Sequence, residues 1–417
     1  MKGKIVLSGL LILSIVILSV VGGCKSATPA KKTLTIGGIA FLTGPASQGG
    51  IACQRGWQLA VDKYNEAGGL KVGNDTYQIN LIVEDDKMSA DQASAADTKL
   101  IKQDGATIIV GPLIDALKTV VYPITSQNGV LMAIVDGLNC SVPYAHSADV
   151  AANKPLLMRV HWACNEISPY VLDYLVKQYP NVKKVAVNSV VEEASVVMVT
   201  GGKNDIDDQL AARGLQRVGE IEQFAPDITD FEPLMTRILS SKPDAILQVI
   251  STPVTFGLSV KAARALGFNG PMISLMHLDI DNQAALSGDP DISDMFGPGL
   301  TLADEPGMPQ AVKDVKAQYL KKYPAKELIS DVLLVGYNGM DVLLQTIQKA
   351  RSVNPATILK TYEGLTKSGD LQTLWGPAYV GGKQTVGVNR VLNYPYMLDR
   401  VVNGKSTNFE TVFVKVP

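Results

Sequence analysis

The sequence predicts an α/β protein of two lobes, each built on a parallel sheet with helices on both faces. One observation is that short apolar runs alternate with helical segments, which is typical of βαβ units. A second is that this alternation stops at residues 136–154, a stretch rich in small and polar residues, and then starts again. Because the two sets have similar lengths, they favour two lobes over one long sheet.

The first set supplies four strands and three helices. The first strand, residues 34–41, is a buried apolar run that ends at a Thr-Gly-Pro turn. The helix that follows, residues 53–67, has Trp57, Val61 and Tyr64 at helical spacing and stops at a Gly-Gly pair. By the same criteria we expect strands at 77–83, 107–110 and 130–135, and helices at 90–103 and 116–128.

The second set repeats this organisation. Strands are expected at 184–187, 245–250 and 271–275, and helices at 171–178, 200–213, 236–240 and 260–266. After residue 297 the chain is helical again at 310–322 and 329–351. A tail follows in which we expect strands at 371–379, 385–391 and 397–402.

Composition excludes several classes of protein. The chain has 417 residues, 46% of them hydrophobic, so it is too apolar for a disordered protein. Its net charge of −2 offers no basic face, so no nucleic acid is expected as a partner. Only 4 cysteines in this length do not form a disulfide scaffold.

No catalytic motif is recognisable. The glycine–lysine pair in residues 376–383 has the wrong spacing for a P-loop, and the glycines of the first strand do not fit a dinucleotide fingerprint. His146, His161 and His277 lie outside any zinc motif. We therefore expect neither a metal nor a cofactor, and a binding protein rather than an enzyme.

The first 24 residues read as an export signal. Lys2 and Lys4 precede an apolar run at 5–21, and a Gly-Gly pair stands directly before Cys24. This arrangement resembles the lipobox of bacterial lipoproteins, in which the cysteine thiol takes a diacylglycerol and becomes the new N-terminus. The prediction is a signal peptide at 1–23, a flexible leader at 24–33 and an extracytoplasmic protein anchored to the membrane by lipid. The alternative is an uncleaved signal anchor.

Three cysteines remain besides Cys24, and they leave two interpretations open. Cys140 or Cys164 could act as a nucleophile with a histidine such as His161. The other interpretation is one disulfide and a spare thiol, with Cys140 and Cys164 as the favoured pair because they bracket the irregular stretch.

Several short motifs, in order, resemble type I periplasmic binding proteins of the leucine/isoleucine/valine-binding group. They lie at 35–45, 56–69, 84–86, 109–112, 230–231, 241–245, 262–267 and 402–405. The resemblance implies two Rossmann-like lobes joined by a three-strand hinge that close on a ligand. Lobe 1 would comprise residues 34–153 and 298–370, and lobe 2 residues 154–297 and 371–417. Lipidated members of this family capture solutes for ABC importers.

Ligands of open parallel sheets bind beyond the carboxyl ends of the strands. Loops at such ends therefore supply the candidate ligand-binding residues. In lobe 1 these are Ser47, Gln48, Asp115, Ala116, Asp136, Gly137, Leu138 and Asn139, and in lobe 2 they are Trp162, Glu193, Thr252 and His277.

Two acidic residues distinguish these loops from the family pattern. Amino-acid-binding members use hydroxyls and backbone amides to hold the ligand carboxylate, whereas this chain has Asp115 and Asp136 at the matching places. The aspartates would repel a carboxylate and suit an amine, with Trp162 covering the cation through a cation–π contact. The alternatives are that the aspartates cap helices and that Trp162 belongs to the core.

The functional prediction is a lipid-anchored solute-binding protein of an ABC importer, monomeric, that takes an amino-acid-like or amphipathic, cationic solute. Its partners would be the solute, the permease and the membrane. One alternative is a ligand-sensing receptor domain, which would be followed by a membrane-spanning helix. The other is a cysteine-dependent amide hydrolase, which a disulfide between Cys140 and Cys164 would dismiss.

Overall fold

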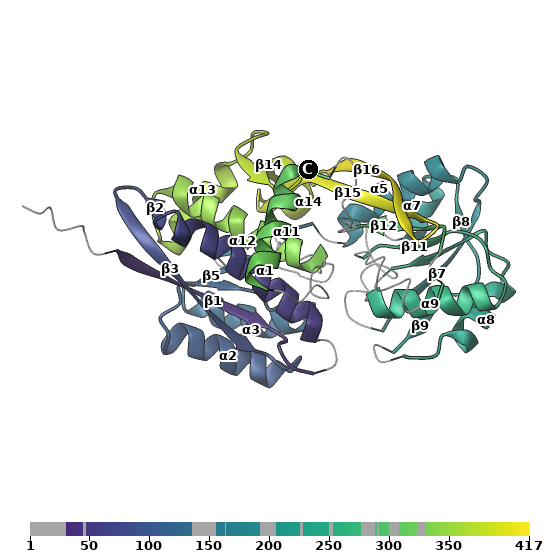
Figure 1. Cartoon of the computed structure of the whole chain (residues 1–417), viewed down its shortest axis with the longest axis horizontal. Helices are drawn as coiled ribbons and strands as arrows, with labels where there is room; N and C mark the ends of the chain where they lie inside the picture. Colours follow the sequence, from purple (N-terminus) through teal and green to yellow (C-terminus); the bar gives the residue numbers. More distant parts are fainter. Residues whose placement is uncertain are drawn as a thin grey trace, which may run out of the picture.

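The computed structural model describes residues 31–44, 47–135, 156–162, 164–191, 206–225, 228–249, 253–276, 288–289, 292–299, 308–323 and 331–417. These residues form two α/β lobes that lie side by side along the long axis of the molecule (Figure 1). Their strands form one continuous path, β2-β3-β1-β4-β5-β6-β15-β12-β11-β10-β7-β8, in which β15 is common to both lobes. The predicted α/β class with parallel sheets is confirmed.

Lobe 1 carries the first six strands of this path. They are β1 (Lys32–Ala40), β2 (Leu70–Val72), β3 (Asp75–Asp85), β4 (Ile108–Val110), β5 (Leu131–Ile134) and β6 (Leu157–Arg159). All pair in parallel except β2, which is antiparallel to β3. The helices are α1 (Ser47–Glu66), α2 (Ala90–Lys102), α3 (Asp115–Gln127), α11 (Gln310–Lys322), α12 (Asp331–Ala350) and α13 (Pro355–Gly364).

Alternate residues of the lobe 1 strands pack on opposite helical layers. Gly37 faces α2, since a Cβ there would come within 2.6 Å of Ile109 and 3.0 Å of Leu100. Gly38 faces α1, since its Cβ would lie 3.0 Å from the Trp57 ring. The sheet is therefore buried on both faces, which explains why its strands read as unbroken apolar runs.

Helices α1 and α12 approach so closely that only glycine fits at their contact. A Cβ on Gly56 would lie 2.2 Å from the carbonyl oxygen of Leu333, and one on Gly336 would lie 2.7 Å from that of Cys53. Residues 329–351 were expected as a helix, and the family resemblance implied that this part of the chain belongs to lobe 1. The contact shows that this late helix returns to the first lobe.

Lobe 2 carries the remaining strands of the path. They are β7 (Lys184–Val190), β8 (Gln216–Arg217), β10 (Ala245–Gln248), β11 (Met272–Ser274) and β12 (Met295–Pro298), with β9 (Glu222–Phe224) paired to β7. Its helices are α5 (Cys164–Gln178), α7 (Ile206–Ala211), α8 (Glu232–Ser240) and α9 (Pro253–Ala265). Figure 1 shows α5 and α7 on one side of this sheet and α8 and α9 on the other.

The end of the chain links the lobes. It comprises β13 (Leu371–Thr373), β14 (Gly376–Gly381), β15 (Val391–Val402) and β16 (Lys405–Val414). Strand β15 pairs with β6 and β14 through its first residues and with β12 through residues 398–401. Strand β14 pairs with the lobe 1 end of β15. These pairings favour a chain that passes from lobe 1 to lobe 2 within β15, and not at residue 371, the predicted boundary. The lobe boundaries stay a prediction.

Two predicted strands of the tail are wrong. Residues 371–379 form two antiparallel strands, β13 and β14, joined by a turn, rather than one strand. Residues 385–391 were expected to be extended, but the chain there forms the short helix α14 (Lys383–Val386), and β15 begins only at Val391. Gly382 and Gly387 flank this helix with φ values of 109° and 85°. Because these left-handed conformations favour glycine, the two glycines allow a tight turn where the β-branched residues alone suggested a strand.

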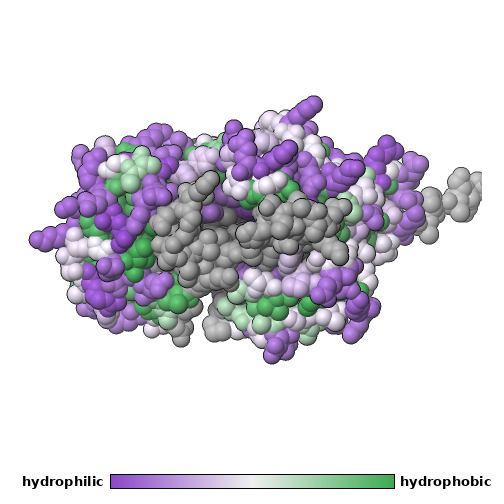
Figure 2. Space-filling model, turned by 180° about the vertical axis from the view of Figure 1, so that it is seen from behind, coloured by the Kyte–Doolittle hydropathy of each residue, from purple (hydrophilic) through white to green (hydrophobic). Residues whose placement is uncertain are grey.

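On the face shown in Figure 2, the coloured surface of both lobes is mainly hydrophilic, with apolar patches between the hydrophilic areas. Within the described ranges, no helix has the length and apolar character needed to cross a bilayer.

Asp97 is an unusual buried carboxyl in lobe 1. It lies on the inner side of α2 with a relative exposure of 0%, and among the residues that the structure describes neither of its oxygens has a hydrogen-bond partner. Burial therefore raises its pKa from 3.8 to about 7. Because the folded state then binds a proton that the unfolded state releases, the free energy of unfolding should fall between about pH 4 and pH 7.

We predict that Asp97→Asn removes this pH dependence and raises stability at pH 8 by a few kcal/mol, since each pKa unit corresponds to about 1.4 kcal/mol. Urea unfolding at pH 4, 6 and 8 measures the effect. Asp91→Asn, an exposed site on the same helix, is the control and should retain the wild-type pH dependence. An Asp97→Asn variant with unchanged pH dependence would contradict the assignment.

Candidate functional site

The carboxyl edge of lobe 1 is shaped around Asp85 at the end of β3. Its carboxylate accepts hydrogen bonds from the Leu42 amide (2.8 Å), the Thr43 hydroxyl (2.6 Å) and the Lys87 amide (2.9 Å). Partial burial raises the pKa of Asp85, but these hydrogen bonds outweigh it and the net direction is downward. The ionised carboxylate thus fixes the turn after β1, which leads to the start of α1.

Ser47 and Gln48 are the first two residues of α1. The Ser47 amide donates to the carbonyl of Gly44 at 3.2 Å, which connects the helix start to the turn after β1. Ser47 is partly exposed and Gln48 is exposed. Both therefore lie at the carboxyl edge of the lobe 1 sheet, as predicted for residues that follow its first strand.

Asp115 forms a buried ion pair at the same edge. It is the first residue of α3, after a cis peptide bond between Gly111 and Pro112, and its carboxylate lies 2.8 Å from Lys118 Nζ. The two side chains are 5% and 0% exposed. The N-cap position is Ile114, without a side-chain cap, so Asp115 does not cap the helix. Its negative charge is balanced within the protein.

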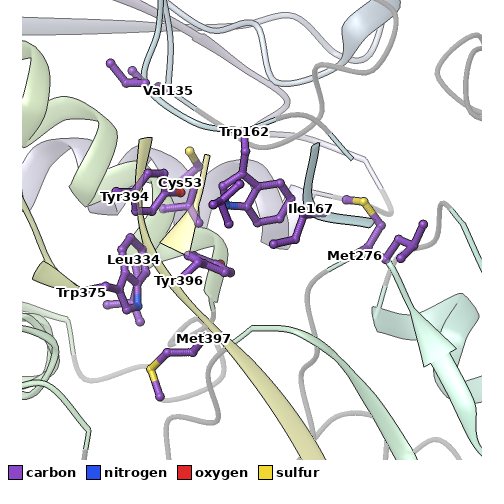
Figure 3. Close-up of a cluster of buried hydrophobic side chains, with 14 of the residues drawn as sticks. Cys53, Val135, Trp162, Ile167, Met276, Leu334, Trp375, Tyr394, Tyr396 and Met397 are labelled. Atoms are coloured by element: carbon purple, nitrogen blue, oxygen red, sulfur yellow. The ribbon is translucent and has the colours of Figure 1, made fainter. Parts of the chain in front are cut away.

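Trp162 lies in a buried aromatic cluster where the chain first leaves lobe 1. Its ring centroid is 4.3 Å from that of His161 and 5.1 Å from that of Tyr396, in an edge-to-face arrangement. Trp375 lies 4.8 Å from Tyr396. Figure 3 shows this cluster between residues of both lobes, with Val135 and Leu334 on one side and Ile167 and Met276 on the other.

Two tyrosines of β15 supply polar contacts inside the cluster. The Tyr396 hydroxyl donates to the carboxylate of Asp331 at 2.8 Å, and the Tyr394 hydroxyl is hydrogen-bonded to His161 Nδ1. Burial raises the pKa of both tyrosines well above 10, so both hydroxyls keep their protons. Asp331 begins α12, where the helix dipole also favours its negative charge.

An ion pair fixes the first crossing between the lobes. Arg159, the last residue of β6, lies 2.7 Å from Glu166 of α5, and both side chains are largely buried. The hydroxyl of Tyr362 in α13 donates to the carbonyl of Arg159 at 2.6 Å. These contacts hold His161 and Trp162 between β6 and α5.

Of the predicted ligand-binding residues, the structure describes Ser47, Gln48, Asp115, Ala116 and Trp162. Ala116 is exposed on α3 beside Asp115. Asp136, Gly137, Leu138, Asn139, Glu193, Thr252 and His277 lie outside the described residues, as do Cys24 and Cys140. Cys164 begins α5, but its side chain is not among those described, so the predicted disulfide stays a prediction.

Sequence reasoning missed Lys118, Asp331, Tyr394 and Tyr396. The spacing of Asp115 and Lys118 by three residues in a predicted helix was a usable signal for an ion pair. No comparable signal marked the tyrosines, because their partners are 233 and 65 residues away in the sequence. In the described part of the chain, no group of three His, Cys, Asp or Glu is placed to hold a metal ion.

We predict that Lys118→Met lowers the free energy of unfolding by about 3–5 kcal/mol, because it leaves the Asp115 carboxylate buried without this cation. Urea denaturation measures the change. Asp115→Asn combined with Lys118→Met should recover part of the loss, since the buried charge is then removed as well.

Lys63→Met is the matched control. Lys63 pairs with Asp341 at a similar distance, 2.9 Å, but its side chain is 49% exposed. Exposed pairs contribute at most about 1 kcal/mol. If both lysine variants lost the same stability, the Asp115–Lys118 pair would not be the buried contact described above.

Comparisons with known proteins agree with this architecture. A Leu/Ile/Val-binding protein of Rhizobium johnstonii, BraC3, is 26% identical over 346 residues, 82% of this chain and 86% of that protein. The structure of the binding protein LivJ from Streptococcus pneumoniae with isoleucine has a TM-score of 0.69 at 18% identity, covering 92% of this chain and 100% of that one. A solute-binding protein from R. palustris with 4-hydroxybenzoate has a TM-score of 0.70 at 18% identity, covering 93% and 98%.

At such low identities the solved structures support the fold alone, and it is the fold that the sequence motifs predicted. A family profile described as "Periplasmic binding protein" matches residues 33–398, most of the chain. Members of this family are substrate-binding proteins of ABC transporters and not enzymes. The chain therefore belongs to the periplasmic binding protein family, in its type I form.

Proposed function

We propose that this protein is an extracytoplasmic lipoprotein that captures a small amino-acid-like or amphipathic solute by closure of its lobes and delivers it to an ABC permease. The observation that carries the proposal is the path of β15, which pairs with β6 in the sheet of lobe 1 and with β12 in the sheet of lobe 2. A strand shared in this way lets two rigid lobes rotate about a narrow connection, the geometry of hinge closure around a ligand.

The solute would lie between the carboxyl edges of the two sheets. We propose Ser47, Gln48, Asp115 and Ala116 on the lobe 1 side, together with the loop at residues 136–139. We propose Trp162 at the base of this site and Glu193, Thr252 and His277 on the lobe 2 side. Support comes from the members of this set that the structure describes. Ser47 and Gln48 follow β1, Asp115 and Ala116 follow β4, and Trp162 follows β6.

The ion pair between Asp115 and Lys118 bears on which charge the solute carries. An unpaired carboxylate there would favour a cation, but Lys118 already balances it. The relatives named above bind isoleucine or 4-hydroxybenzoate by their titles, and both compounds carry a carboxylate. We therefore favour a solute with a carboxylate and a second, less polar part over a simple amine.

We predict that at least one of L-leucine, L-isoleucine, benzoate, 4-hydroxybenzoate or 3,4-dihydroxybenzoate raises the melting temperature, because a ligand of the folded state stabilises it by mass action. At a hundredfold excess over Kd the stabilisation should be about 3 kcal/mol. Differential scanning fluorimetry detects the shift, and small-angle scattering should show a smaller radius of gyration with that compound. Putrescine serves as the cationic comparison.

Stabilisation by putrescine alone would contradict the proposed solute class and restore the cationic interpretation. A radius of gyration that no stabilising compound changes would contradict closure of the lobes. Turnover of any compound in the panel would contradict a binding function.

The lipid anchor has its own test. In a bacterial host, the full-length chain should partition into the detergent phase of Triton X-114, whereas Cys24→Ser should move to the aqueous phase because it lacks the thiol that would be lipidated. A chain that begins at residue 25 is the aqueous control. A Cys24→Ser variant that stays in the detergent phase would instead indicate an uncleaved signal anchor.

A further inference from the structure

Two buried amides lie side by side in the lobe 2 sheet. Asn188 of β7 and Gln248 of β10 are register partners on adjacent parallel strands, so their side chains point to the same face. Both have a relative exposure of 0%. Within the described chain, neither the nitrogen nor the oxygen of either amide has a hydrogen-bond partner.

The amides belong to a polar row that crosses the sheet. Ser274 of β11 is the next register partner of Gln248, and it is also fully buried. Its hydroxyl is used locally, donating to the Met276 carbonyl (2.9 Å) and accepting from the Met276 amide (3.0 Å). The serine therefore shapes the turn after β11 and leaves the amides unsatisfied.

The row continues on the same face beyond Ser274. The neighbour of Ser274 on β12 is Gly297, where a Cβ would lie 2.5 Å from the Ser274 carbonyl oxygen. Gly297 is in turn the register partner of Asp399 on β15, whose side chain is 2% exposed. The row thus has a carboxylate at one end and two neutral amides at the other.

The row lies on the face away from α5. Phe296, which precedes Gly297, packs against Tyr174 in a tilted arrangement and stacks with Tyr179, at centroid distances of 5.3 and 5.8 Å, so it faces the α5 layer. Residues one position along a strand point to the opposite face, which puts Gln248 and Asn188 on the side of α8 and α9 (Figure 1). Gln248 and Ser274 are the last residues of their strands, at the edge where open α/β sheets bind ligands.

Buried amides without partners cost free energy, and native proteins keep few of them. Each amide offers two donor hydrogens and one acceptor oxygen. A hydroxyl or a carboxamide both donates and accepts, so either could satisfy both kinds of atom. A carboxylate only accepts and an ammonium only donates, so neither could satisfy both kinds of atom.

We propose that Asn188 and Gln248 form a subsite in lobe 2 that binds an uncharged donor–acceptor group of the solute, a hydroxyl or a carboxamide. This inference rests on the proposed function. It assigns the neutral end of the solute to lobe 2, opposite the Asp115–Lys118 ion pair at the edge of lobe 1.

The binding test compares probes that differ in one hydroxyl. Calorimetric titration with 4-hydroxybenzoate and benzoate should give wild-type protein at least a tenfold preference for the hydroxylated compound. Asn188→Leu and Gln248→Met should each abolish the preference, so that the variant binds the two compounds with about equal affinity. Their melting temperatures without ligand should stay the same or rise, because apolar groups replace unsatisfied polar ones.

Thr346→Val is the control variant, since Thr346 is equally buried but lies in α12 and donates to the Val342 carbonyl. It should keep the wild-type preference. A preference that survives in both amide variants would overturn the proposal, as would wild-type protein that binds the two probes equally well.

A second measurement does not depend on these probes. If the amides face the cleft, their side-chain NH2 groups should exchange with deuterated solvent within minutes as the lobes open, with NMR signals assigned by their loss in the variants. Asn393 is the protected reference, since its side chain is 1% exposed and is bonded to both the amide and the carbonyl of Val416. Exchange as slow as that of Asn393 would overturn the proposal.

The two measurements separate the subsite from the proposed function. If no compound of the thermal-shift panel binds but the amides exchange rapidly, the proposed solute class fails and the cleft-facing subsite stands. If compounds bind but the amides are protected and the variants bind normally, the proposed function stands and the subsite fails.

Discussion

The arrangement of the whole molecule depends on β15, which belongs to the sheets of both lobes. Its first residues pair with β6 and β14, and residues 398–401 pair with β12. Between these pairings lie Tyr394 and Tyr396, which bond to His161 and to Asp331. The partners come from the first crossing and from the start of α12, so three segments far apart in sequence are held at one point. Any rotation of the lobes must occur around these contacts.

Rigid lobes are the other requirement for closure, and the packing of lobe 1 supplies it. The α1–α12 contact has no room for a methyl group at Gly56 or Gly336. Because well-packed interiors resist small displacements, motion is expected to concentrate where the chain crosses between lobes. Trp162 packs in the aromatic cluster against His161 and Tyr396, at the first crossing between the lobes.

Much of this architecture was predictable because it depends on local pattern. Apolar runs of strand length, separated by helices, indicated both sheets, and the order of weak motifs indicated the family. Long-range contacts were not predictable: nothing in the tail showed that Tyr396 meets Asp331, 65 residues earlier. Asp115 differs from these cases: its charge alone suggested a cationic solute, although Lys118 three residues later in the predicted helix was a usable signal for an ion pair. The strand expected at 385–391 failed because glycine conformation outweighed β-branched composition.

The charged and neutral groups of the two lobes differ in a way that bears on selectivity. At the edge of lobe 1 the buried Lys118 and Asp115 compensate one another. At the edge of lobe 2 the amides of Asn188 and Gln248 carry no charge, and within the described ranges their donors and acceptors have no partners. Solutes that differ by one hydroxyl would therefore be distinguished mainly in lobe 2, since a missing hydroxyl leaves buried amides unsatisfied. Selectivity then depends on closure, because only the closed form brings the solute against both edges.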